Sequence, residues 1–432
     1  MSDRGAEAAE LLAELLRINT VNPPGNERPA QELIAARLAA AGVQSEMLGA
    51  QPGRPNLVAS LRGEGEGPAL CLLGHVDTVL ATPSEWSHDP WSGDEADGYI
   101  WGRGALDMKN QVAAELAAVL SLARDGWRPA RGELKLVTVA DEETGGELGA
   151  EWITREHPDK VRCDMLINEG GGAAFDLAGK RCYGVCCAEK GVFRFTVRTN
   201  GVAGHASMPA MGDNALLKMA PILASLGESR PGYRVTDAPL HFLRGIGEDP
   251  DDVPGAIERL RANSPLLAIM LEPMFAITFT PTRISASEKI NVIPSRAELR
   301  VDCRVPPGLG AEEVRSDIAD VLGEDGFEIE FTEEVVGNRS PAESSLMDAI
   351  AGRVAQFDPD AIVVPVVLPG FTDSRHFRDA FPECVAYGFF PQRHQTLLEG
   401  APLIHGADER IDARDLALAA DFYADLVTDV LG

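Results

Sequence analysis

Three consecutive acidic residues follow an apolar run in the first half of the chain. In TVADEETGGELGA, residues 138–150, Asp141, Glu142 and Glu143 stand before a pair of glycines. Two ionised carboxylates side by side in a partly buried pocket would raise the pKa of one of them. A cation removes this conflict, because one carboxylate can bind a metal ion while its neighbour takes a proton from an attacking water. The alternative is a solvated acidic turn before a helix capped near Thr144.

Further residues of metal-binding type occur in four other short motifs. LLGHVDTV places His75 two residues before Asp77, so both side chains leave one face of a strand, and a carboxylate beside a metal-binding imidazole fixes its tautomer. LINEGGG supplies Glu169, and LIHGADERI supplies His405 near the C-terminus. WGRGALDMKN brings Asp107 to the start of a helix. Each motif alone has an ordinary alternative, such as a satisfied core histidine or a helix N-cap aspartate.

The motifs together are more specific than any one of them. Two histidines and three carboxylates form a mixed nitrogen and oxygen donor set. Such a set suits two zinc ions that share a carboxylate, with Co²⁺ or Mn²⁺ as substitutes.

The elements that must position these residues alternate between strand and helix. NLVASL, ALCLLG, ELKLVTVA and CDMLIN predict short strands, and stretches such as NQVAAELAAVLSLARDG predict helices between them. This alternation indicates an α/β layer in which helices cover both faces of the sheet. Because His75, Glu143 and Glu169 each follow an apolar run, we expect them at the carboxyl ends of strands, where open α/β sheets bind ligands.

A different pattern begins near Gly191. VFRFTVRT, a helix from about 214 to 226, MFAITFTPTRI, AELRVDCRV, a helix from about Ala311 and FEIEFTE predict a split βαβ unit, a small α+β sheet with helices on one face. The proline- and acid-rich stretch 228–264 inside it predicts a long loop, of the kind that forms lids or mobile segments. After about Val335 the α/β alternation resumes and closes with a helix.

The chain is therefore expected to fold as two domains. At 432 residues it exceeds the size at which single cores stop growing. We predict a discontinuous domain of residues 1–188 and 335–432, which carries the metal-binding motifs, and a second domain of residues 189–334 inserted into it.

Composition limits the partners and the compartment. The chain has 67 acidic residues against 39 Lys and Arg, a formal net charge of -28, which disfavours nucleic acid or an anionic membrane as a partner. The N-terminal stretch is acidic and amphipathic, unlike a signal peptide, and no segment approaches the ~18 apolar residues of a membrane span. Seven cysteines without a CxxC pair suit a reducing compartment. We expect a cytoplasmic protein.

The motifs and their order resemble the dinuclear zinc metallopeptidases, a family that includes acetylornithine deacetylase, succinyl-diaminopimelate desuccinylase, aminoacylase, glutamate carboxypeptidase and carboxypeptidase S. The resemblance runs from LLRINTVNPPGNE to HGADERI and so covers nearly the whole chain. It implies a zinc-peptidase catalytic domain with a ferredoxin-like inserted domain that serves as lid and dimerisation domain, and a cis peptide bond after Asp107.

The resemblance also implies a role for each residue of the metal site. His75 and Glu169 would bind one zinc ion, and Asp107 would bridge it to a second. The second ion would be bound by Glu143 and His405. Two further carboxylates would assist, with Asp77 behind His75 and with Glu142 as the general base.

Other motifs resemble the substrate-binding segments of that family. GVAGHASMP contains His205, which would reach into the active site of a partner subunit and stabilise the oxyanion. NVIPSRAELRVDCR contains Asn291 and Arg304, which would hold the substrate carboxylate. GFTDSRHF resembles the GGTDAR-like loop of the family and supplies Arg375, with Phe371 in place of a glycine.

The implied activity is hydrolysis of an amide or peptide bond next to a free carboxylate. The enzyme would be an N-acyl-amino-acid deacylase or a carboxypeptidase or dipeptidase, acting as a homodimer on N-acyl amino acids or short peptides. A biosynthetic deacylase of the acetylornithine deacetylase or succinyl-diaminopimelate desuccinylase type is the first alternative, and a catalytically silent binding or scaffold relative is the second. The branch that hydrolyses N-carbamoyl amino acids usually has histidine where this chain has Glu169.

Overall fold

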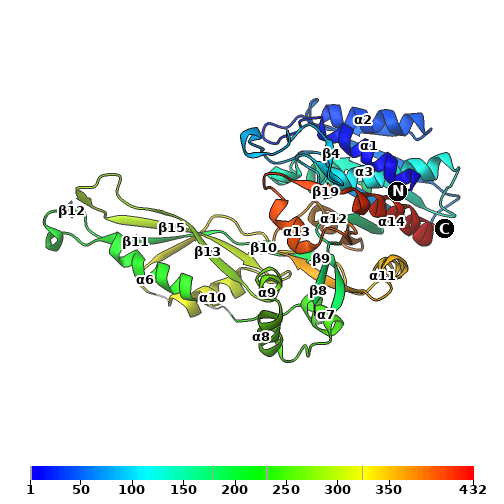
Figure 1. The fold of residues 1–432 in the computed structure, drawn as a ribbon. Helices are drawn as coiled ribbons and strands as arrows, with labels where there is room; N and C mark the ends of the chain where they lie inside the picture. Colours follow the sequence, from blue (N-terminus) through cyan, green and yellow to red (C-terminus); the bar gives the residue numbers. More distant parts are fainter. Residues whose placement is uncertain (1, 178, 230–231, 324) are drawn as a thin grey trace.

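The computed structural model describes residues 2–177, 179–229, 232–323 and 325–432. A larger lobe contains both termini, and the middle of the chain forms an elongated smaller lobe (Figure 1). Within the described residues, no helix combines the length and the apolar content that a membrane crossing requires.

The larger lobe is built on a mixed sheet. Its strands are β1 (Ser45–Leu48), β2 (Asn56–Arg62), β3 (Ala69–His75), β6 (Glu133–Val139), β7 (Met165–Asn168), β8 (Ala174–Leu177), β9 (Lys180–Glu189), β17 (Ile362–Leu368) and β18 (Val385–Gly388). In the described chain the order is β1–β2–β6–β3–β7–β18–β9–β17, with β8 paired to β9. The predicted strands at NLVASL, ALCLLG, ELKLVTVA and CDMLIN are confirmed as β2, β3, β6 and β7.

Helices cover both faces of this sheet, as predicted. The helices of this lobe outside residues 189–334 are α1 (Asp3–Leu16), α2 (Arg28–Ala40), α3 (Lys109–Arg124), α4 (Ala150–Glu156), α5 (Pro158–Val161), α11 (Ser345–Phe357), α12 (Ser374–Ala380), α13 (Leu397–Gly400) and α14 (Ala413–Leu431). Side chains of β3 alternate between two cores: Leu70 and Leu72 join the one that contains α1, α3 and α14, whereas Cys71 and Leu73 join the one that contains α4 and α12. Both faces of β3 are therefore buried, which explains why its sequence is a continuous apolar run.

Parallel pairing places the metal-binding motifs at one edge of the sheet. β3 runs parallel to β6 on one side and to β7 on the other. Their carboxyl ends therefore lie side by side, and the residues that follow these strands converge.

A small three-stranded sheet, β4 (Asp94–Ala96), β5 (Tyr99–Trp101) and β19 (Arg410–Asp412), adds to this lobe. β5 pairs antiparallel with β19. This pairing brings the glycine-rich approach to Asp107 beside the segment that follows His405.

The smaller lobe has the predicted strand, helix, strand, strand, helix, strand order. Its sheet contains β10 (Gly191–Val192), β11 (Phe195–Asn200), β13 (Thr278–Ser285), β15 (Arg296–Val305) and β16 (Glu328–Phe331). Helices α6 (Ala215–Glu228) and α10 (Ala311–Leu322) pack on it and share its apolar core. A short ladder of β12 (Gly204–His205) and β14 (Val292–Ile293) lies at the end of this lobe farthest from the larger lobe (Figure 1). The predicted ferredoxin-like unit is confirmed.

The stretch 228–264 is largely helical, so the prediction of a long loop is wrong; residues 230 and 231 lie outside the described residues. The stretch contains α7 (Asp237–Ile246) and α8 (Val253–Asn263), which are followed by α9 (Pro265–Leu271) and the 3-10 helix η4 (Glu272–Phe275). Pro254 and Pro265 stand in the first turns of α8 and α9, where a missing N–H costs nothing, and Asp252 caps α8. The prolines and the aspartate that favoured a loop in the sequence therefore lie at the starts of helices.

The helices α7 to α9 pack on the larger lobe. Phe242 of α7 is fully buried in the same apolar core as Val364 of β17. The chain thus returns from the smaller lobe to the larger one within residues 189–334. The boundaries at 188/189 and 334/335 stay a prediction, and the segment from α7 to η4 belongs by packing to the larger core.

Candidate metal centre

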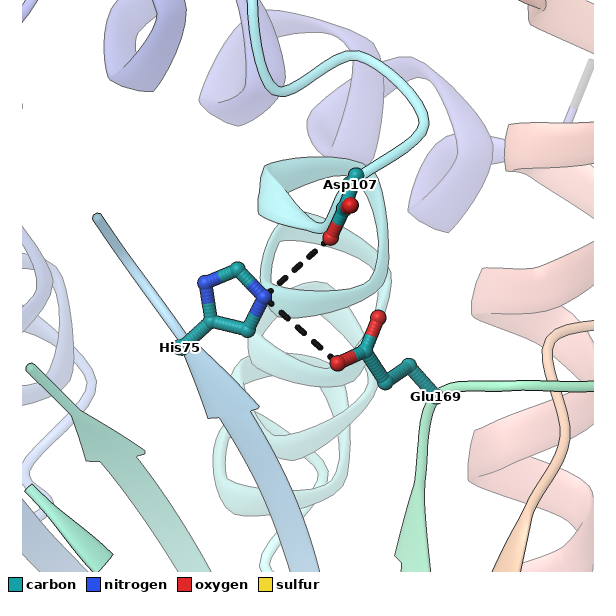
Figure 2. Close-up of side chains that lie close together, drawn as sticks. All are labelled: His75, Asp107 and Glu169. Carbon is teal, nitrogen blue, oxygen red and sulfur yellow. Dashed lines mark hydrogen bonds and ion pairs between the residues drawn. The ribbon is translucent and has the colours of Figure 1, made fainter. Parts of the chain in front are cut away.

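The first cluster forms around His75 at the end of β3. His75 is 1% exposed, and its Nε2 lies 3.2 Å from Oδ1 of Asp107 and 3.6 Å from Oε1 of Glu169 (Figure 2). Asp107 precedes α3, and Glu169 follows β7, the strand beside β3. The peptide bond after Asp107 is cis, as the resemblance implied. Three donor atoms from three elements thus converge on one point.

The second cluster shares Asp107 with the first. Nε2 of His405 lies 3.0 Å from Oδ2 of Asp107 and 3.4 Å from Oε2 of Glu143. Asp107 therefore presents one carboxylate oxygen to each imidazole, which is the arrangement expected of a bridging ligand. The sequence-predicted ligands His75, Asp107, Glu143, Glu169 and His405 are all brought together.

The electrostatics of the two clusters fit divalent cations. Burial raises the pKa of Glu169 to about 7 and raises the pKa of Glu143 above its usual value. Hydrogen bonds to Asp107 and Glu143 raise the pKa of His405 to about 10. Oε1 of Glu143 is buried and has no hydrogen-bond partner among the described residues. A cation would satisfy this orphaned oxygen and replace the protons that the crowded carboxylates otherwise retain.

Glu142 and Glu143 leave the chain in different directions. They lie in the 3-10 turn η2 (Glu142–Thr144), which the chain enters through Asp141 in a left-handed conformation with φ 71°. Oε2 of Glu142 is 3.9 Å from Nε2 of His75, whereas Glu143 faces His405. Their side chains are only 15% and 5% exposed, so the alternative of a solvated acidic turn is wrong.

Asp77 connects the first cluster to this turn. Its Oδ1 lies 3.6 Å from Nδ1 of His75, and the same ring nitrogen is 3.0 Å from the backbone oxygen of Asp77. The backbone N–H groups of Glu142 and Glu143 donate to the two carboxylate oxygens of Asp77, each at 3.2 Å. Asp77 therefore both orients the imidazole and holds the turn that carries the two glutamates.

The third acidic residue, Asp141, belongs to neither metal cluster in the described part of the chain. Its Oδ1 accepts hydrogen bonds from Asn22 and Thr144, and Arg54 forms an ion pair with it at 3.0 Å. Asn22 also donates to Asp77 at 2.8 Å. Asp141 thus fixes the turn η2 through contacts with Asn22, Thr144 and Arg54. This role was not predicted from the sequence.

His205 and Asn291 lie far from the clusters of their own chain. His205 is exposed on β12, and the carbonyl of Asn291 accepts from the N–H of Ala206 beside it. Arg304 stands at the other end of β15, eight residues beyond Arg296 and thus roughly 26 Å along the strand. One chain does not bring Asn291 and Arg304 together.

Arg304 and Arg375 meet at Phe371 instead. The guanidinium of Arg375 lies 4.5 Å from the centre of the Phe371 ring, and that of Arg304 lies 5.8 Å from it. Arg304 is also paired with Asp302 at 2.7 Å. The ring that replaces the glycine of the family motif therefore links a side chain of the smaller lobe to one of the larger lobe.

Three buried charged residues near the clusters were not predicted to have a role. Asp373 is 2% exposed, burial raises its pKa well above the usual value, and its Oδ2 has no hydrogen-bond partner among the described residues. Arg103 and Glu409 form a buried ion pair beside Asp107. All three residues lie inside the sequence motifs described above. Their local sequence could not show that they would be buried beside residues so distant in the chain.

Comparison with known proteins agrees with this geometry. Residues 71–429 match peptidase family M20/M25/M40. The chain is 27% identical over 394 residues to a probable carboxypeptidase S-like 2 of Dictyostelium discoideum, covering 86% of this chain and 74% of the relative. It is 29% identical over 377 residues to the N-fatty-acyl-amino acid synthase/hydrolase PM20D1 of Xenopus tropicalis, covering 82% and 71%.

The fold also matches a solved structure over its whole length. The M20 family metallo-carboxypeptidase Sso-CP2 from Sulfolobus solfataricus superposes with a TM-score of 0.70 at 19% identity, covering 99% of each chain. The family match spans most of the chain and includes every residue of the two clusters. The chain is therefore a member of peptidase family M20/M25/M40 and a metal-dependent hydrolase of amide or peptide bonds.

Proposed function

We propose that this enzyme binds two zinc ions per subunit and hydrolyses an amide or peptide bond next to a free carboxylate, in N-acyl amino acids or short peptides. The observation that carries the proposal is the pair of clusters that share Asp107, with the carboxylate of Glu142 beside them. The named activities of the two relatives, a carboxypeptidase and an N-acyl-amino acid hydrolase, belong to this reaction class.

The donor set supports zinc. His75 and Glu169 would hold one ion, Glu143 and His405 the other, and Asp107 both. Such ions polarise a carbonyl group and acidify water. Co²⁺ or Mn²⁺ would fit the same nitrogen and oxygen donors.

Glu142 is proposed as the general base. It is largely buried, and burial raises its pKa well above the usual value of a glutamate. A glutamate whose pKa lies above its usual value is a stronger base toward the attacking water, and it can return the proton to the leaving amine. Asp77 supports this role because it fixes the backbone of the turn.

Arg304 and Arg375 are proposed to bind the substrate carboxylate. A guanidinium matches a carboxylate through two parallel hydrogen bonds. No carboxylate of the described chain lies within ion-pair distance of Arg375, whereas Arg304 is shared with Asp302. Arg375 is thus the cation with the larger capacity for a new anionic partner.

We further propose a homodimer formed through the smaller lobe, in which His205 and Asn291 complete the active site of the partner. Two observations support this assembly. His205 on β12 and Asn291 beside β14 lie at the end of the smaller lobe that is farthest from the larger lobe and its metal clusters (Figure 1). Large apolar side chains are exposed around them, among them Met211 at 71%, Leu217 at 70% and Ile290 at 102%. Exposed apolar patches of this kind mark protein interfaces.

A cytoplasmic location is also proposed. The seven cysteines are free and buried. Free thiols are typical of proteins in a reducing compartment.

The experiment that tests the function is amine release from a panel of N-acetyl, N-succinyl and long-chain N-acyl amino acids and of dipeptides. The protein is loaded with zinc, and Glu142→Ala serves as the blank. Release that depends on Glu142 from one class of substrate would support the proposal and separate a deacylase from a carboxypeptidase. Absence of release from every member, in protein with two bound metal ions, would contradict it.

A further inference from the structure

The two metal clusters depend on loops that are distant in sequence. Asp107 ends a glycine-rich loop before α3, and His405 belongs to the loop before β19. The relative position of these loops decides whether the two oxygens of Asp107 can face two ions at once.

Glu409 holds the loop of Asp107 through its backbone. Oε1 of Glu409 accepts from the N–H of Leu106 at 2.6 Å and from the N–H of Asp107 at 3.0 Å. Oε2 accepts from the N–H of Gly104 at 3.2 Å and from Nη1 of Arg103 at 2.5 Å. The side chain of Glu409 is fully buried, so every one of these bonds is shielded from water.

Arg103 holds the loop of His405 in the same manner. Its Nη2 donates to the carbonyl oxygen of Gly406 at 2.8 Å and to that of His405 at 3.3 Å. A third bond runs to the carbonyl of Leu80 at 3.2 Å. The guanidinium is 3% exposed and lies under the ring of Trp86, at 5.1 Å from its centre.

A buried ion pair is a poor source of stability, because desolvation of both charges offsets their attraction. Here the backbone hydrogen bonds of the pair go to the two ligand residues and their chain neighbours, apart from the one bond to Leu80. We infer that Arg103 and Glu409 are positioning residues, which together fix the separation of Asp107 and His405 and thereby set the affinity of the second metal site. This inference rests on the proposed dinuclear centre.

The test is Co²⁺ binding by the full-length, metal-stripped protein, measured by calorimetry and by the visible absorption of the bound ion. Glu409→Gln keeps the size of the side chain but presents an NH₂ group to donors. The affinity of this variant for one of the two Co²⁺ ions should fall about 10- to 100-fold, which is the usual effect of losing a residue that supports a metal ligand. The visible absorption band of that ion should change as well. Arg103→Lys keeps the charge but lacks the planar group that reaches three carbonyls, and should show the same loss.

Glu115→Gln is the matched control, since Glu115 is a fully buried glutamate on α3 whose carboxylate accepts from Gln111. It should bind both ions as the unmodified protein does. Two Co²⁺ ions bound with unchanged affinity and spectrum in a folded Glu409→Gln or Arg103→Lys would overturn the inference, even if the thermal midpoint fell. Should Glu409→Gln fail to fold, Arg103→Lys decides alone. Fewer than two ions in the unmodified protein would instead overturn the proposed dinuclear centre and the inference with it.

Discussion

Glu142 and Glu143 are neighbours in the chain, yet their carboxylates face different imidazoles. Oε2 of Glu142 lies 3.9 Å from Nε2 of His75, and Oε2 of Glu143 lies 3.4 Å from Nε2 of His405. The N–H groups of both residues donate to the carboxylate of Asp77, which fixes this divergence. Adjacent residues can therefore perform two different tasks in one site.

The first prediction separates those tasks. Glu142→Ala should keep both metal ions and lose about 10²- to 10⁴-fold in kcat, the usual contribution of a general base. Glu143→Ala should lose metal, because it removes a proposed ligand of the second cluster. Elemental analysis and steady-state kinetics on the same samples measure both effects. Equal metal loss in the two variants would show that base and ligand are wrongly assigned.

The second prediction concerns the dimer. His205→Ala and Glu142→Ala should each be inactive alone, but a mixture of the two should recover part of the activity after subunit exchange. Recovery is expected because a mixed dimer has one site with an intact Glu142 and an intact His205 from the partner. Exchange is verified with differently tagged subunits. A mixture that exchanges without recovering activity would rule out a shared site.

The third prediction concerns Phe371, whose ring lies between Arg304 and Arg375. Removing the ring in Phe371→Ala releases both guanidinium groups, each of which gains about 0.5–1 kcal/mol from such a contact. KM for a substrate with a free carboxylate should rise roughly 5- to 30-fold while kcat changes little. Phe371→Tyr keeps the ring and should keep KM. A rise in KM of equal size in both variants would argue against the contact.

The fourth prediction concerns the helices that replace the expected loop. Phe242 of α7 is fully buried, so Phe242→Ala should lower the free energy of unfolding by about 3–5 kcal/mol. Ile269 of α9 is 70% exposed, and Ile269→Ala should change the free energy of unfolding by less than about 0.5 kcal/mol. Urea unfolding distinguishes the two values. Similar small effects in both variants would mean that α7 does not pack on the larger lobe.

The fifth prediction is a pH dependence of stability at Glu115, which belongs to neither metal cluster. Burial raises the pKa of Glu115 well above its usual value of 4.5. The folded state therefore favours the protonated carboxyl, and the stability that this group contributes is present below pH 4.5 and is lost as the pH rises toward the folded pKa. Glu115→Gln mimics the protonated form. Its unfolding free energy should match that of the unmodified protein near about pH 4.5 and should exceed it increasingly as the pH rises toward the folded pKa of Glu115.

The parallel strands made part of the candidate metal centre predictable. His75 ends β3, Glu143 follows β6 and Glu169 follows β7, so an apolar run followed by a donor residue was sufficient to place each at one edge of the sheet. His405 has no such run before it. Its place in the site could be inferred only from the resemblance of its motif to a known family.

Two features could not be read from local sequence. Arg103 and Glu409 are 306 residues apart, and nothing in either motif indicates that one would neutralise the other in the core. The stretch 228–264 contains prolines and aspartates, which start helices as readily as they interrupt them. Only the burial of residues such as Phe242 against β17 distinguishes these cases, and that burial depends on the tertiary fold.

The packing of α7 to α9 on β17 also decides how the smaller lobe can be exchanged between related enzymes. Removing residues 189–334 as one block would expose the surface of β17 that contains Val364 and packs in one core with Phe242 of α7. A chimera that keeps the larger lobe intact would need to retain the segment from Asp237 to Phe275 and replace the sequence on either side of it. The smaller lobe therefore consists of two separate stretches of sequence, one before Asp237 and one after Phe275. Recombination at only two crossover points would not preserve the core of the larger lobe.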